Sequence, residues 1–228
     1  MSEISKPAQW IVWGGLGILI AILTAAYVRT ELFKPPANVV STPFGIASSN
    51  DDKELPILSA LSEFSFTNQS GLTVTRETLA GTPWVADIIF TRCPSICPQM
   101  TFQMSRLQEA LGPDSPVKLV SFTTDPEFDT SEVLKAYGER FGATPDRWHF
   151  LTGPKQDLSD FIKEDLKLIA FEKPEDERTS PTDLYNHSVH FAIVDGDGNL
   201  RRVVHANDTN INVIDEIVAT VNEFVKTD

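Results

Sequence analysis

The sequence is poor in two kinds of residue, and each scarcity excludes a class of protein. Its 228 residues include 2 cysteines, too few for a scaffold held together by disulfide bonds. There are 19 Lys and Arg against 32 Asp and Glu, which gives a formal net charge of −13. Nucleic-acid binding needs a basic surface that displaces counterions, so this balance argues strongly against it. Peripheral binding to anionic lipids is disfavoured for the same reason.

Charged residues are also missing from one long stretch near the start of the chain. Residues 7–28 contain none, and residues 10–28 are almost continuously apolar. Because about 20 helical residues cross a hydrocarbon core of roughly 30 Å, we predict a transmembrane helix over 10–28. It follows a short N-terminal tail, residues 1–9. The competing interpretation is a cleaved signal peptide, with Thr24 and Ala26 as the small residues before the cut.

The layout of an anchor followed by a large domain predicts how the chain is placed. We expect a single-pass protein of the cell inner membrane, with the tail inside and the C-terminal domain on the periplasmic or extracytoplasmic side. No Arg-rich transit peptide precedes the span, which favours a bacterial membrane over a mitochondrial one. Residues 29–60, rich in Pro, Ser and Asp, are predicted to form a linker to a globular domain over 61–228.

Hydrophobic periodicity in this domain predicts strands that alternate with helices. The expected strands are residues 64–67, 72–75, 84–90, 117–122, 148–151, 189–194 and 200–204. The expected helices are residues 98–111, 129–141, 156–166 and 211–225, with Asp129 as an N-cap. This order implies an α/β sandwich with a central mixed sheet. A strand, a turn with two cysteines and a helix at its centre indicate a thioredoxin-like three-layer version.

Cys93 and Cys97 lie in the turn between a buried strand and a helix. Pro98 suits the first helical position, which would put Cys97 at or next to the N-cap. The positive end of a helix lowers the pKa of a thiol there, and both metal binding and disulfide exchange require the thiolate. The alternative is that the pair serves as two small buried hydrophobic residues.

The third candidate ligand is one of 4 histidines. His149 and His205 lie within apolar strands, where a structural role is expected. His187 lies in a loop at the entrance of a strand, a common place for ligands, and His190 lies inside that strand. Spacing alone does not choose between the last two.

Several segments together resemble the Sco (SenC) family. They are Phe90–Pro98, Ser121–Thr130, Leu151–Gly153, and His187–Ser188 ahead of Asp197–Gly198, in order within residues 62–226. The resemblance implies a membrane-tethered, copper-binding protein of thioredoxin fold that assists assembly of cytochrome c oxidase.

The family pattern also implies a ligand set. Cys93 and Cys97 correspond to the thiol ligands and His187 to the ligand histidine, whereas His190 is not carried over. Two thiolates and one imidazole suit Cu(I) and tolerate Cu(II), while structural zinc normally takes four ligands. Met100 and Met104 have helical spacing and are expected in the core.

The leading hypothesis is therefore a copper metallochaperone rather than an enzyme. It would accept copper from a donor protein and deliver it to the binuclear copper site of an oxidase subunit. The alternative is a thiol–disulfide oxidoreductase, with Cys93 and Cys97 as its redox-active pair, that keeps the oxidase cysteines reduced. An anchored redox sensor is a further possibility. His187 discriminates between the first two, because copper transfer needs it and dithiol exchange largely does not.

Several acidic residues have structural explanations as well. Asp87, in a buried strand, is either a paired structural carboxylate or a support for the cysteine turn. Asp125 and Asp129 are explained by capping and by bracing of a loop. Residues 195–199 mimic the start of a calcium loop but lack its later glycine and glutamate, so a turn is expected there.

Overall fold

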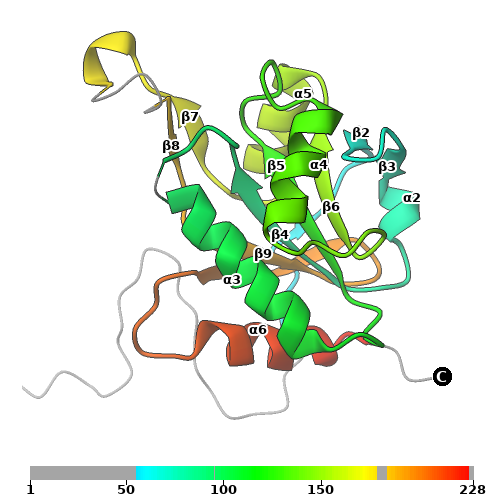
Figure 1. Cartoon of the computed structure of the whole chain (residues 1–228). Helices are drawn as coiled ribbons and strands as arrows, with labels where there is room; N and C mark the ends of the chain where they lie inside the picture. The colour runs from blue at the N-terminus through cyan, green and yellow to red at the C-terminus, as the bar shows by residue number, and fades with distance from the viewer. Residues whose placement is uncertain (1–54, 95, 179–183, 226–228) are drawn as a thin grey trace, which may run out of the picture. The chain divides into compact units, whose positions relative to one another are not determined.

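The computed structural model describes residues 55–94, 96–178 and 184–225 (Figure 1). They belong to one compact unit that begins at residue 54. The predicted tail, the anchor and nearly all of the linker lie outside these residues. Within the described part, no helix is long and apolar enough to cross a membrane.

A mixed sheet forms the middle layer of the unit. In the described residues it has eight strands in the order β1-β10-β9-β4-β5-β6-β2-β3. Strands β4, β5 and β6 pair in parallel and the other neighbours are antiparallel. The strands are β1 (Ser59–Ala60), β2 (Ser65–Asn68), β3 (Thr73–Thr75), β4 (Trp84–Ile89), β5 (Lys118–Thr123), β6 (Trp148–Thr152), β9 (His190–Val194) and β10 (Asn199–His205).

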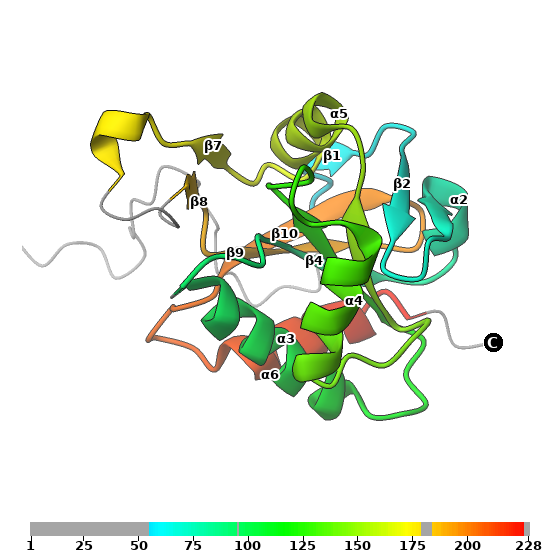
Figure 2. The same cartoon turned by 45° about the horizontal axis from the view of Figure 1, so that its top comes forward.

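Helices cover both faces of this sheet, and Figure 2 shows α5 on the opposite side from α3 and α6. One face carries α3 (Ile96–Leu111), α4 (Ser131–Arg140) and α6 (Val213–Asn222). The other carries α5 (Lys155–Asp160) and the π-helix η1 (Phe161–Asp165). Short α2 (Arg76–Leu79) follows β3. The predicted α/β sandwich with a central mixed sheet is confirmed.

Strand β4 shows why an apolar run marks the centre of such a sheet. All six of its residues are buried, because helices cover the sheet on both sides. Val85 and Ile89 belong to the core beneath α3, whereas Ala86 and Ile88 belong to the core beneath α5. Successive side chains thus point to opposite faces, as the geometry of a strand requires.

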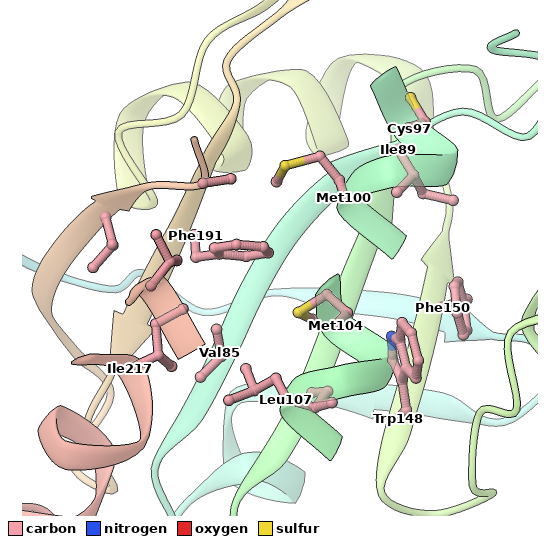
Figure 3. Close-up of a cluster of buried hydrophobic side chains, with 14 of the residues drawn as sticks. Val85, Ile89, Cys97, Met100, Met104, Leu107, Trp148, Phe150, Phe191 and Ile217 are labelled. Carbon is pink, nitrogen blue, oxygen red and sulfur yellow. The ribbon is translucent and has the colours of Figure 1, made fainter. Parts of the chain in front are cut away.

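Helix α3 packs on the sheet through residues spaced three and four apart. Met100, Met104 and Leu107 are each at most 1% exposed and lie among Phe191 and Ile217 (Figure 3). The expectation that both methionines are core residues is confirmed. A buried helix face fixes the position of the helix, and with it the turn that leads into the helix.

Several features differ from the prediction, among them β1, which lies within the predicted linker, and α2, which was not expected. Helix α4 begins at Ser131 with Thr130 as its N-cap, so the assignment of this role to Asp129 is wrong. A second, two-stranded sheet pairs β7 (Ala170–Glu172) with β8 (Tyr185–His187), and a short 3₁₀ helix, η2 (Glu175–Glu177), follows β7. Three-residue strands carry too little alternation to be recognised, and only the pairing partner makes them strands. Most other predicted elements agree within about three residues.

Candidate metal centre

The cysteine turn connects the end of β4 to the start of α3. Helix α3 begins at Ile96, so Cys97 is its second residue and Pro98 its third. The prediction that Pro98 is the first helical residue is therefore wrong. The shift costs no hydrogen bond, because the first N–H groups of a helix have no acceptor within it and proline lacks only such a group.

Both cysteines are thiols and both are buried: Cys97 is completely buried and Cys93 is 8% exposed. The Cys97 N–H donates a hydrogen bond to Cys93 Sγ over 3.4 Å. One of the N–H groups at the start of α3 thus finds its acceptor in the other cysteine. The turn therefore brings the sulfur of Cys93 against the first turn of the helix that carries Cys97.

Burial changes the acidity of Cys97. It raises the pKa of the Cys97 thiol far above the usual range, and the hydrogen bond and charge of Cys93 raise the pKa further. The expectation that the helix end lowers this pKa is therefore wrong for Cys97, since loss of hydration outweighs the helix dipole. Cys97 is therefore a thiol at neutral pH, and a soft metal ion that took its sulfur as a ligand would have to displace the proton.

Asp129 braces the cysteine turn from a distant part of the chain. Its buried carboxylate accepts hydrogen bonds from the Thr91 N–H at 3.2 Å, from the Thr91 hydroxyl, and from the Thr123 hydroxyl at 2.5 Å. Burial raises the pKa of Asp129 although all three hydrogen bonds lower it. Asp129 thus ties the residues before Cys93 to the end of β5. The expected bracing role is confirmed.

A second contact holds the same turn at the surface. Arg92 donates to Asp125 Oδ2 from Nε at 3.1 Å and from Nη2 at 2.5 Å. Its guanidinium carbon lies 4.3 Å from the centre of the Phe128 ring, which is 44% exposed. An arginine held by an ion pair and an aromatic face has little rotational freedom, which orders the residue next to Cys93.

Asp87 lies completely buried in β4. Its Oδ1 accepts a hydrogen bond from the Ser121 hydroxyl at 2.5 Å, and the Ser121 oxygen accepts one from the Trp148 indole at 3.0 Å. The charge of Asp87 adds a smaller contribution, after burial, to the raised pKa of Cys97. Asp87 is therefore a hydrogen-bonded structural carboxylate that also acts electrostatically on the cysteine turn.

His187 is the last residue of β8, not a loop residue as predicted, and it pairs with Ala170 of β7. Strand β8 packs against the segment that leads from β4 to Cys93: the ring centres of Tyr185 in β8 and Phe90 after β4 lie 5.1 Å apart. The side chain of His187 lies outside what the structure describes. Among the described side chains, no three or more His, Cys, Asp or Glu gather closely enough to hold a metal ion.

The other histidines divide into two groups. His149 is half-buried in β6, with Nδ1 3.4 Å from Asn68 Nδ2, and burial lowers its pKa. A structural role fits these contacts, as expected. The rings of His190 in β9 and His205 in β10 lie against each other, a contact that no pattern in the sequence indicated.

A mixed-sheet sandwich with a dithiol turn between a central strand and a helix defines a class of thioredoxin-like proteins. Within that class, the family model described as SCO1/SenC matches residues 56–222. The chain therefore belongs to the SCO1/SenC family, and the resemblance noted from its motifs is confirmed.

Curated relatives agree with this assignment. The "SCO1 protein homolog" of Bacillus subtilis is 38% identical over 145 residues, which cover 63% of this chain and 72% of the relative. A "putative copper-binding protein" of Stutzerimonas stutzeri is 30% identical over 155 residues, 67% of this chain and 72% of the relative.

Solved structures confirm the fold. A SCO1/SenC family lipoprotein from Bacillus anthracis gives a TM-score of 0.65 at 29% identity, covering 74% of this chain and 96% of that chain. BsSco, described as a member of the Sco family of cytochrome c oxidase assembly proteins with a disulfide switch, gives 0.64 at 31%, covering 77% and 100%.

Proposed function

We propose that this protein is a membrane-tethered copper metallochaperone. It binds one copper ion through Cys93, Cys97 and His187 and delivers the ion to the binuclear copper site of cytochrome c oxidase. Membership of the SCO1/SenC family supports the assignment, as do a relative described as copper-binding and a structural relative described as an oxidase assembly protein.

The observation that carries the proposal is the position of the two cysteines. Both thiols lie on one turn, with Cys93 Sγ 3.4 Å from the Cys97 backbone nitrogen, and thiolates are the soft ligands that Cu(I) prefers. Bracing by Asp129 and by the Arg92–Asp125 pair holds the turn in place before the ion arrives. A pre-formed pair loses little conformational entropy on binding.

A site with three ligands also suits delivery of its cargo. A thiolate or imidazole of the acceptor adds to the copper ion, and a ligand of this chain then leaves and takes up a proton. The ion keeps its oxidation state throughout. The raised pKa of Cys97 favours the return of a proton to that sulfur, which promotes release.

Placement in the cell follows from the N-terminal segment. We propose that residues 10–28 anchor the chain in a bacterial inner membrane and that residues 29–53 link the anchor to the folded domain, because β1 (Ser59–Ala60), at the end of the predicted linker, already belongs to the sheet. The domain then faces the periplasm, where the donor protein and the oxidase subunit reach it. The relative from Bacillus anthracis described as a lipoprotein supports attachment to a membrane.

A second candidate function is dithiol exchange, and the disulfide switch described for BsSco is the observation that favours it. The thiolate of Cys93 would attack a disulfide of the oxidase subunit, and Cys97 would then resolve the mixed disulfide. A Cys93–Cys97 disulfide forms, and two protein thiols of the partner are released. The two protons end on those thiols, so atoms and electrons balance.

One titration separates the two functions. Cu(I) stoichiometry and affinity are measured without oxygen on the reduced full-length protein, on His187→Ala, and on His149→Ala as a histidine control. We expect one copper per chain, an affinity greatly weakened in His187→Ala, and no change in His149→Ala. Copper binding indifferent to His187, together with a readily cycled Cys93–Cys97 disulfide, would support dithiol exchange instead.

A further inference from the structure

His190 and His205 form a cross-strand pair at one end of the β9–β10 hairpin. They are direct partners in the register, and their ring centres lie 4.8 Å apart with the planes at 87°. The Ala206 N–H donates to the Val189 carbonyl at 2.8 Å, on the outer side of the pair. That bond identifies His190 and His205 as a non-hydrogen-bonded pair, the kind in which facing side chains come closest.

The spacing of the two rings fits a shared metal ion. Two imidazoles bound to one tetrahedral ion, with metal–nitrogen distances of about 2.0–2.1 Å, have ring centres about 5 Å apart. We infer that His190 and His205 form a second metal site, which binds a divalent transition-metal ion such as Cu(II) through two imidazoles. Water completes the coordination, because this site has no third protein ligand among the described side chains.

Access and protonation also suit a metal ion. His205 is exposed and His190 half-buried, so an ion can reach the pair from solvent. Burial lowers the pKa of His190, and the charge of His205 lowers it further. The neutral imidazole that these effects favour at His190 is the form that binds metal.

One contact competes with metal binding. The Asn207 N–H donates to His205 Nδ1 at 3.1 Å, which leaves the proton of the neutral ring on Nε2. For Nε2 to bind an ion, this proton must move to Nδ1 and the hydrogen bond must break. Losing one such bond weakens the affinity by about tenfold at most, so the site is weaker than two unencumbered imidazoles would be.

The pair is separate from the proposed copper centre. Side chains alternate along β9, so His190 faces the same side of the sheet as Ala192 and Val194, which lie in the core beneath α5. Cys93 and Cys97 lie in the core beneath α3, on the other face. The inference therefore goes beyond the proposed function and does not depend on it.

The test removes the proposed copper centre first. Full-length protein carrying Cys93→Ser, Cys97→Ser and His187→Ala is titrated with Cu(II), and the bound ion is examined by electron paramagnetic resonance. We expect one Cu(II) with hyperfine coupling to two imidazole nitrogens. Adding His205→Gln should lower the affinity at least tenfold and leave coupling to one nitrogen at most. Adding His149→Gln, a histidine in another strand, should change neither.

His205 is exposed, so its substitution leaves the fold intact, and thermal unfolding of each variant checks this. His190→Gln provides an independent second variant with the same expected loss. Absence of bound Cu(II), binding unaffected by His205→Gln, or a single-nitrogen signal before that change would each overturn the inference. Failure of the copper centre itself would appear in the wild-type titration and not in this one.

Discussion

The β9–β10 hairpin and the cysteine turn are each organised around one buried carboxylate, but the carboxylate belongs to the turn itself in the hairpin and to a distant residue in the cysteine turn. In the β9–β10 hairpin, Asp195 accepts from the N–H groups of Asp197 and Asn199, at 3.0 and 2.9 Å, and from Arg201 at 2.9 Å. Every partner lies within six residues. The Asp195 carboxylate is thus paired within the hairpin itself, and the turn expected at residues 195–199 is present.

The cysteine turn receives its carboxylate from far along the chain. Asp129 lies 38 residues beyond Thr91, whose N–H and hydroxyl both donate to it. The carboxylate of the hairpin is therefore paired by its own turn, whereas the carboxylate at the turn with the two thiols comes from a distant part of the fold. We therefore expect Asp129 to affect the copper affinity of the proposed ligands, and Asp195 to affect only the stability of the fold.

The largest effect should come from the thiols themselves. Cys97→Ser removes a proposed soft ligand without changing the shape of the core. We expect its Cu(I) affinity to fall by more than the roughly 100-fold limit typical of residues behind the ligands. A competition titration with a Cu(I) chelator measures it. An affinity near that of the wild type would exclude the cysteine turn as the binding site.

The two carboxylates test the comparison directly. Asp129→Asn should weaken Cu(I) binding by about 10- to 100-fold, because an NH2 group replaces one of the two oxygens that accept hydrogen bonds from Thr91 and Thr123, and the turn before Cys93 loosens. Asp195→Asn should leave the affinity unchanged. Each variant should lose about 1–3 kcal/mol of unfolding free energy, measured by urea denaturation.

Equal loss of stability with unequal loss of affinity would confirm that only the Asp129 brace acts on the ligands. Should both variants bind copper equally well, the distinction between the two turns has no functional meaning.

The protonation of Cys97 predicts a dependence on pH. Since burial raises the pKa of this thiol, copper must displace its proton at neutral pH. The affinity for Cu(I) should therefore rise with pH, by about tenfold per unit for one proton released. The same titration at several pH values measures the slope. Cys97→Ser is the control, and its affinity should rise less steeply with pH, by the contribution of one proton. An unchanged slope would show that Cys97 does not supply the proton.

The smallest effect is expected at the surface contact of the turn. Arg92→Gln removes a partly exposed ion pair and a contact with the Phe128 ring, which together contribute about 1 kcal/mol to stability. Copper affinity should change by less than about threefold, because Asp129 still holds Thr91. A larger loss of affinity would show that the Arg92–Asp125 pair, rather than Asp129, is the main brace of the turn.

Much of this molecule could be predicted from patterns in the sequence. The apolar run of β4 and the period of Met100, Met104 and Leu107 predicted a central strand and the helix that packs on it. The spacing of Cys93 and Cys97 between these two elements predicted the dithiol turn. These signals are readable because each depends on neighbours in the sequence.

Contacts between residues far apart in the sequence were set by the tertiary structure. Local patterns predict Asp129 as a helix cap and a lowered pKa for Cys97 at the helix end, and they give no sign of the strands β7 and β8. Packing reversed each of these, by burying Cys97, by aiming Asp129 at Thr91 and by pairing two three-residue strands. The contact of His190 with His205 likewise exists only because β9 and β10 pair in one register. Desolvation and register are properties of the folded chain, so no local pattern could report them.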